Sequence, residues 1–193
     1  MTDRWLIAGL GNPGPQYAET RHNAGFFVVD ELVSRAGGKL KAHKNRTSDV
    51  LEARVSGVPS VLAEPRSFMN ESGGPVASLK DYYKVPPERI VVVHDELDIP
   101  FGTVRIKLGG GDGGHNGLKS IRRSIGTGDF LRVRFGIGRP PGRMEPAAFV
   151  LKAFSGTERK DLGWATGRTA DAVESLLADG LEAAQNQYHA DPA

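Results

Sequence analysis

The stretch Ile90-Val91-Val92-Val93-His94-Asp95-Glu96-Leu97-Asp98 decides the fold class of this 193-residue chain. Its first four residues are all β-branched and apolar, which is typical of a central strand buried on both faces of a sheet. The run then gives way to a histidine and a carboxylate. Because ligands of open α/β sheets bind outside the carboxyl ends of the strands, Asp95 is a candidate for a functional site.

Other strands are expected on both sides of this run. Residues 5–8 form a second buried strand that enters a Gly/Pro turn, and residues 51–55 and 60–63 are expected to pair as a hairpin. Residues 103–108 and 131–135 alternate apolar with basic side chains. Each of these two strands should therefore bury one face and point Arg and Lys from the other.

Apolar residues at helical spacing separate the strands and predict helices over residues 24–36, 75–83, 118–125 and 157–184. Residues 39–48 are expected to form a polar, basic loop, and the Pro/Gly-rich residues 139–146 are a candidate lid. The pattern predicts a single α/β domain over residues 1–193, with a mixed, mostly parallel twisted β-sheet surrounded by helices. The order of the tail beyond about residue 187 is left open.

Composition excludes several classes of protein and of site. The chain has no cysteine, which excludes disulfides, thiolate zinc sites, iron–sulfur clusters and a cysteine nucleophile. Its apolar runs are far shorter than the roughly 20 residues of a transmembrane helix, and its first residues lack the pattern of a signal peptide. A cytoplasmic location without membrane contact is therefore expected.

The net charge of +2 conceals a segregation of charge along the chain. Residues 105–143 hold nine basic and two acidic residues, a net charge of +7, and the rest of the chain carries −5. Twelve of the 25 glycines lie between Gly102 and Gly142, six of them within residues 109–117. Such a region is suited to holding phosphates through side chains and backbone N–H groups, although a solvated face with several turns explains the same composition.

Two alternative sites are suggested by short patterns. Residues 9–14 match the dinucleotide pattern G-x-G-x-x-G, but prolines and polar residues follow where that site requires a helix, so binding of a nucleotide cofactor is not expected. Metal binding is the competing use of five residues, none of which has the spacing of a zinc site: His22, His94, Asp95, Asp112 and His115. No metal is therefore expected.

Six motifs occur in order along the chain: Gly-Leu-Gly-Asn-Pro-Gly (9–14), Thr-Arg-His-Asn-Ala-Gly (20–25), Phe-Met-Asn-Glu-Ser-Gly (68–73), His-Asp-Glu-Leu-Asp (94–98), Lys-Leu-Gly-Gly-Gly-x-Gly-Gly-His-Asn-Gly-Leu (107–118) and Arg-x-Gly-Ile-Gly-Arg-Pro (134–140). Together they resemble the motifs of bacterial peptidyl-tRNA hydrolases. The resemblance implies an enzyme that acts without a cofactor. It would hydrolyse the ester between the carboxyl end of a peptide and the 3′ ribose of tRNA, which recycles tRNA from prematurely released peptidyl-tRNA. We expect a monomer.

The same resemblance implies a role for each matching residue. The catalytic histidine would be His22 and its partner Asp95, and Asn12, Asn70 and Asn116 would be asparagines that hold the substrate. Tyr17 and Met69 would line the same cleft. Among the asparagines, we ourselves expect Asn12 nearest the scissile carbonyl, as a catalytic residue, and Asn70 and Asn116 on the peptide side. Lys107 and Arg134 would face tRNA phosphate.

These residue types suit ester hydrolysis. An aminoacyl ester is already activated, so one positioned base and a water molecule suffice, and histidine has an ordinary pKa near neutrality. A neighbouring carboxylate can hold the imidazole tautomer, and asparagine offers both hydrogen-bond donors and an acceptor. A non-catalytic RNA-binding module with the same basic face is the alternative. Release of free tRNA from an N-blocked aminoacyl-tRNA discriminates between the two.

Overall fold

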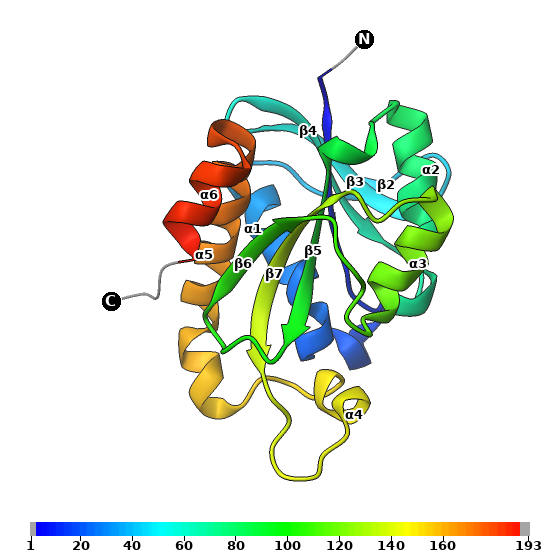
Figure 1. Ribbon diagram of the computed structural model, residues 1–193. Helices are drawn as coiled ribbons and strands as arrows, with labels where there is room; N and C mark the ends of the chain where they lie inside the picture. Colours follow the sequence, from blue (N-terminus) through cyan, green and yellow to red (C-terminus); the bar gives the residue numbers. More distant parts are fainter. Residues whose placement is uncertain (1–2, 190–193) are drawn as a thin grey trace.

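The computed structural model describes residues 3–189, and within them seven strands form one sheet in the order β2-β3-β4-β1-β5-β7-β6 (Figure 1). The strands are Trp5–Gly9 (β1), Lys41–Ala42 (β2), Ser48–Val55 (β3), Val58–Pro65 (β4), Ile90–Leu97 (β5), Val104–Leu108 (β6) and Leu131–Gly138 (β7). The four central strands run parallel, and β3 and β6 run antiparallel to their neighbours. The predicted mixed, mostly parallel sheet is confirmed.

Helices cover both faces of the sheet. One face carries Ala24–Arg35 (α1), Gly156–Asp179 (α5) and Leu181–Tyr188 (α6), and the other carries Gly73–Tyr83 (α2) and Asn116–Ile125 (α3). A short helix, Pro146–Val150 (α4), follows the end of β7, and four 3₁₀ turns lie at Pro15–Tyr17 (η1), Arg21–Asn23 (η2), Met69–Glu71 (η3) and Pro87–Arg89 (η4). None of the helices between residues 3 and 189 is long and apolar enough to cross a membrane.

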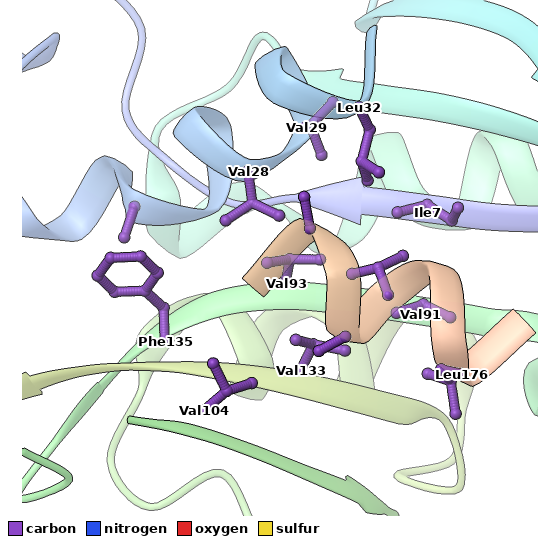
Figure 2. Close-up of a cluster of buried hydrophobic side chains, with 14 of the residues drawn as sticks. Ile7, Val28, Val29, Leu32, Val91, Val93, Val104, Val133, Phe135 and Leu176 are labelled. Carbon is purple, nitrogen blue, oxygen red and sulfur yellow. The ribbon is translucent and has the colours of Figure 1, made fainter. Parts of the chain in front are cut away.

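Strand β5 is the centre of the core, as its apolar run predicts. Val91 and Val93 point toward α1 and α5 (Figure 2). Ile90 and Val92 point toward α2 and α3, and all four side chains are fully buried. Burying a side chain of this size stabilises the fold by roughly 1.5–3 kcal/mol. The β-branched run therefore joins the two apolar layers of the domain.

Helix α1 packs against the backbone of the sheet at its N-terminal end. A Cβ atom on Gly25 would collide with the carbonyl oxygen of Val93, and one on Gly9 would collide with the carbonyl oxygen of Gly25. Glycine at both positions allows this approach, which brings the turn η2 against the carboxyl end of β5. Gly9 of the G-x-G-x-x-G pattern thus serves helix packing, and a 3₁₀ turn follows residue 14 where a dinucleotide site would have a helix.

Two predicted segments differ from the structure, one helix and one loop. The predicted helix over residues 157–184 is interrupted at Gly180, whose φ of 92° and ψ of 172° cannot continue a helix, so α5 ends and α6 begins there. The predicted loop over residues 39–48 contains the short strand β2, which pairs with β3. The sequence left open the order of the tail beyond about residue 187. Tyr188 is the last residue of α6, and residues 190–193 lie outside the described residues.

Helix α6 contacts the last strand of the sheet. Gln185 donates a hydrogen bond from Nε2 to the carbonyl oxygen of Ile106 at 3.0 Å, and Nε2 of His189 accepts one from the N–H of Ile106 at 2.9 Å. Burial is the main cause that lowers the pKa of His189, which favours the neutral ring that this acceptor role requires. The C-terminal helix thereby satisfies both backbone groups of a residue in β6.

Candidate active site

A cleft of about 400 Å³ opens beyond the carboxyl end of β5. Its walls come from the turn η2, the end of β5, the glycine-rich loop before α3, and α4. The residues that line it are His22, Asp95, Glu96, Leu97, Asp98, Gly113, Gly114, His115, Asn116, Pro146, Ala147 and Val150. The cleft thus lies where open α/β sheets bind their ligands.

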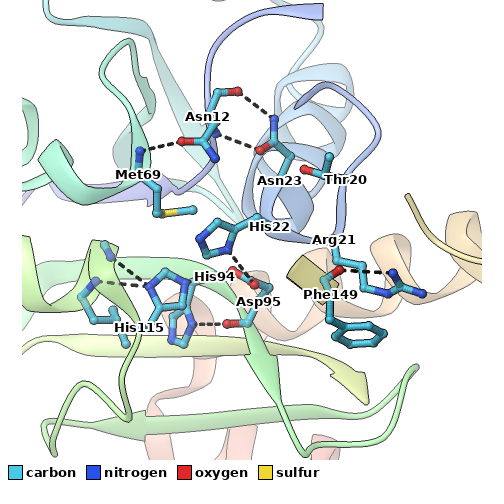
Figure 3. A network of polar contacts seen from close by, with 12 residues as sticks. Asn12, Thr20, Arg21, His22, Asn23, Met69, His94, Asp95, His115 and Phe149 are labelled. Carbon is cyan, nitrogen blue, oxygen red and sulfur yellow. Dashed lines mark hydrogen bonds and ion pairs between the residues drawn. The ribbon is translucent and has the colours of Figure 1, made fainter. Parts of the chain in front are cut away.

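Asp95 binds two histidines at the base of the cleft (Figure 3). Its Oδ2 lies 2.8 Å from Nδ1 of His22, and its Oδ1 lies 2.9 Å from Nε2 of His115. Burial by itself would raise the pKa of the Asp95 carboxyl, but the two histidines outweigh it and hold that pKa well below its usual range. Asp95 is therefore a carboxylate, and each histidine donates a hydrogen bond to it.

The tautomer of His115 follows from its position before α3. Its Nδ1 accepts hydrogen bonds from the N–H groups of Gly117 at 3.1 Å and Leu118 at 3.4 Å, so it caps the N-terminus of the helix. A nitrogen that accepts from backbone N–H groups carries no proton, and Nε2 must therefore carry it and donate to Asp95. The proton positions are assigned from these partners.

His115 is a site residue that the motifs alone did not assign. From the sequence, His115 is a candidate metal ligand only, and its contact with Asp95 spans 20 residues of chain. Ligand atoms of His22, Asp95 and His115 lie within 4.8 Å of one another, so three residues without zinc-type spacing do converge. The helix predicted over residues 118–125 in fact begins at Asn116, which makes His115 its capping residue, so no direct signal for this role was present in the sequence.

His94 lies directly behind His115. Its Nδ1 donates to the backbone oxygen of Asp95 at 2.7 Å, and its ring meets the ring of His115 edge-on, with 4.9 Å between the centroids. Burial and the neighbouring His115 lower the pKa of His94 to about 3. His94 is therefore neutral and adds no positive charge behind the Asp95 carboxylate.

Asn12 lies beside His22, as Figure 3 shows, but it is not one of the residues that line the 400 Å³ cleft. Its Oδ1 accepts a hydrogen bond of 2.7 Å from the backbone N–H of Met69. Because a backbone N–H can only donate, the amide oxygen faces Met69 and the NH₂ group is the free end of the side chain. Among the residues that the structure describes, no acceptor engages that NH₂ group, so Asn12 presents a hydrogen-bond donor.

The other predicted substrate residues surround this centre. Asn116 lines the cleft as the first residue of α3. Met69 is buried and Asn70 exposed in η3, and the ring of Tyr17 meets the exposed ring of Phe68 edge-on at 6.2 Å. Like Asn12, the residues Tyr17, Met69 and Asn70 are not among those that line the 400 Å³ cleft.

The predicted tRNA residues lie on the β6–β7 pair, on the face where α2 and α3 leave the strands uncovered in Figure 1. Lys107 stands opposite Arg132, and Arg105 stands opposite Arg134. Burial lowers the pKa of Lys107, and the charges of Arg134 and Arg132 lower it further. Like charges placed directly opposite on a sheet destabilise it, and Glu96, whose Oε1 lies 3.9 Å from Nη1 of Arg134, offsets part of this positive charge.

Arg132 keeps the predicted alternation, since Leu131 and Val133 belong to the apolar layer on the other face, but the expectation that it points out to solvent is wrong. Arg132 is fully buried, and its guanidinium donates to the carbonyl oxygens of Gly110 at 2.9 Å, Gly128 at 3.0 Å and Gly111. It also lies over the ring of Phe130. Arg132 therefore holds the glycine-rich loop in place and is not available to a ligand.

The residues on either side of His22 connect it to the rest of the cleft. Arg21 is buried, donates to the carbonyl oxygen of Phe149 at 3.3 Å and to Glu158 at 3.0 Å, and lies 4.0 Å over the ring of Phe149 (Figure 3). It thereby fixes α4, which follows the candidate lid over residues 139–146. Asn23 binds the backbone of Asn12.

Known proteins resemble this chain along nearly its whole length. The family model described as peptidyl-tRNA hydrolase matches residues 6–193. The peptidyl-tRNA hydrolase of Frankia casuarinae is 63% identical over 96% of this chain and 94% of that protein, and that of Rhodococcus opacus is 58% identical over 97% and 98%. The crystal structure of peptidyl-tRNA hydrolase from Acinetobacter baumannii has a TM-score of 0.90 and 37% identity, with 98% of this chain and 96% of that chain covered.

Proposed function

The chain belongs to the peptidyl-tRNA hydrolase family and hydrolyses peptidyl-tRNA, and on that premise we propose that His22 is the general base of the reaction. The observation that carries this proposal is the hydrogen-bonded chain from His22 through Asp95 to His115. The bond that breaks is the ester between the carboxyl end of the peptide and the 3′ ribose of the tRNA. A water molecule supplies the attacking oxygen.

The chain of hydrogen bonds supports this role by leaving one nitrogen of His22 free. Because Nδ1–H donates to Asp95, Nε2 carries the lone pair that takes a proton from the water. The Asp95 carboxylate then stabilises the imidazolium that forms, and it cannot rotate because His115 holds its second oxygen. A positioned base of this kind contributes roughly 10²- to 10⁴-fold to the rate.

Asn12 is proposed to donate its NH₂ group to the carbonyl oxygen of the ester as negative charge develops there. Its orientation supports this, since Met69 engages the amide oxygen and leaves only the donor free. Loss of one such donor costs about 10²- to 10³-fold in kcat in enzymes that stabilise an oxyanion. We propose that Asn70 and Asn116 bind the peptide backbone and that Tyr17 and Met69 complete this wall of the substrate site.

The tRNA is proposed to bind across β6 and β7 through Lys107 and Arg134. Support comes from the row of like charges on these strands, because phosphate oxygens would neutralise it. Phosphate contacts carry no sequence information, which suits an enzyme that accepts many tRNAs. Arg134 also lies 3.9 Å from Glu96, a residue of the cleft wall, so the phosphate site and the cleft are adjacent.

We propose that a cytoplasmic monomer carries out the hydrolysis without a metal ion or a cofactor, since a base, a donor and water complete the chemistry. Activity that survives extensive dialysis against a chelator would agree with this, and activity restored only by added metal would contradict it. Size-exclusion chromatography with light scattering tests the monomer.

The deciding experiment measures release of free tRNA from N-acetyl-aminoacyl-tRNA by the wild-type chain and by His22→Ala. The wild type should release tRNA, and His22→Ala should lose nearly all turnover while binding tRNA almost normally. His43→Gln, at the β2 edge of the sheet, is the matched histidine control and should keep full activity. Binding without release by the wild type would identify the alternative, an RNA-binding module, and normal release by His22→Ala would show that another group is the base.

A further inference from the structure

Asn23 follows His22, which lines the cleft, and its side chain binds the backbone of Asn12. We propose that Asn23 is a positioning residue for hydrolysis, which fixes the NH₂ donor of Asn12 relative to the imidazole of His22. The inference rests on the proposed roles of His22 and Asn12.

The side chain of Asn23 binds both backbone polar groups of Asn12. Its Oδ1 accepts from the N–H of Asn12 at 2.8 Å, and its Nδ2 donates to the carbonyl oxygen of Asn12 at 2.9 Å. Asn23 is only 2% exposed, so these two bonds form away from water and use one donor and one acceptor of its amide. Figure 3 shows the amide of Asn23 facing the backbone of Asn12.

The segment around Asn12 needs such a restraint. Pro13 restricts the backbone on the C-terminal side of Asn12, but Gly11 directly before it, and Gly14 after the proline with a φ of 104°, are conformationally permissive. The Asn12 side chain is fixed at its tip by Met69, but that bond alone does not fix the peptide groups that carry the side chain. The two bonds from Asn23 supply this second point of attachment.

His22, the proposed base, directly precedes Asn23 in the chain. His22 and Asn23 belong to the same 3₁₀ turn, which a hydrogen bond from the N–H of Asn23 to the carbonyl oxygen of Thr20 closes at 3.0 Å. While His22 binds Asp95 from this turn, Asn23 binds Asn12 from the same turn. This 3₁₀ turn therefore fixes the distance between the imidazole of His22 and the NH₂ group of Asn12.

A merely structural role for Asn23 would produce a different pattern of rates. A general loosening of the fold would slow the reaction by the same factor whether or not Asn12 had its side chain. A residue that acts by aiming the Asn12 donor has nothing left to aim once that donor is removed. The effects of removing Asn23 and of removing the Asn12 amide should therefore not multiply.

The test is a double-mutant cycle with Asn23→Ala, Asn12→Ala and the double variant, in which kcat, KM and the pH profile are measured on N-acetyl-aminoacyl-tRNA. Asn23→Ala should lower kcat roughly 10- to 100-fold with KM changed by no more than about twofold, because misplacement by about 1 Å can cost 100-fold. The double variant should be no slower than Asn12→Ala to within about twofold. The acid limb of the pH profile should not move in Asn23→Ala, because His22 keeps its bond to Asp95.

Two further variants keep the result interpretable. Asn23→Asp retains the size of the side chain and the bond from the N–H of Asn12, but it places an acceptor oxygen against the Asn12 carbonyl in place of the donor, so its kcat should also fall if Asn23→Ala does not fold. Asn45→Ala, which removes an exposed asparagine that binds Ser78, is the matched control and should leave kcat unchanged.

Losses that multiply in the double variant, or an unchanged kcat in both Asn23 variants, would overturn the positioning role. That outcome differs from failure of the proposed function, in which His22→Ala and Asn12→Ala would themselves retain normal turnover.

Discussion

Replacing Asp95 with asparagine tests the directions of the hydrogen bonds at the centre of the site. The new side chain keeps the shape of aspartate, but one of its two terminal groups is an NH₂ that donates instead of accepting. His115 decides which group faces which histidine, because its Nδ1 accepts from Gly117 and Leu118 and its Nε2 must donate. The amide oxygen therefore faces His115, and the NH₂ group faces Nδ1 of His22.

That orientation forces His22 into the wrong tautomer. Nδ1 would have to accept, the proton would move to Nε2, and no lone pair would face the cleft. The same tautomer reversal in a serine protease lowers kcat by about 10⁴-fold, or about 5.4 kcal/mol of activation free energy at about 1.36 kcal/mol per tenfold. We expect a loss of that size for Asp95→Asn. The thermal midpoint should change little, since the amide still bonds both histidines.

The assay is single-turnover release of tRNA by Asp95→Asn, by His115→Ala and by the double variant. Without His115 the amide is free to turn its oxygen toward His22 and to restore the productive tautomer. The cost of Asp95→Asn should therefore be at least about tenfold smaller in the His115→Ala background than in the wild type. Equal costs in the two backgrounds, or a normal rate for Asp95→Asn alone, would refute the assignment of these bonds.

Three further predictions follow from other parts of the chain. Arg134→Ala should weaken tRNA binding and lower the slope of log affinity against log salt by about 1, whereas Lys84→Ala on the α2 side should not, as binding measured at several salt concentrations will show. Arg132→Met should lower the free energy of unfolding by about 1–3 kcal/mol in urea, since it leaves buried carbonyl groups without a donor, and the exposed Arg123→Met should have no such effect. Burial, with help from a neighbouring carboxylate, raises the pKa of Glu64 from its ordinary 4.5 to about 10, so folding takes up a proton and stability falls as pH rises between those values. Glu64→Gln should therefore raise the thermal midpoint more at pH 8 than at pH 5, and an equal change at both pH values would contradict this account.

The features that could be predicted are those that depend on the order of apolar and polar residues within one segment. The β-branched run at residues 90–93 reports burial on both faces, because such residues fit only a strand covered by two layers. The place of Asp95 at the end of that strand followed from the same argument. The pairing of His22 with Asp95 came from the resemblance of motifs, since 73 residues separate the two side chains and no local pattern joins them.

The parts that could not be predicted depend on contacts between distant segments. Arg132 has the spacing of an outward-facing residue, yet the carbonyl groups of a loop 21 residues earlier bury it. The contact of His115 with Asp95 appears only when α3 is placed against β5. Gly180 lies in a strongly helical pattern that tolerates one glycine, and only the packing of α6 against β6 shows why the helix turns there.

The hydrogen bonds from α6 to Ile106 have a consequence for the behaviour of the enzyme among unfinished polypeptides. An edge strand with free backbone groups is a template onto which an extended peptide can add as a further strand. On β6 the side chains of Gln185 and His189 already occupy those groups at Ile106, and the opposite edge, β2, is only two residues long and carries Lys41. These contacts therefore block the addition of an extended peptide as a further strand at Ile106 of β6. On the other edge, β2 covers β3 only at Asp49 and Val50.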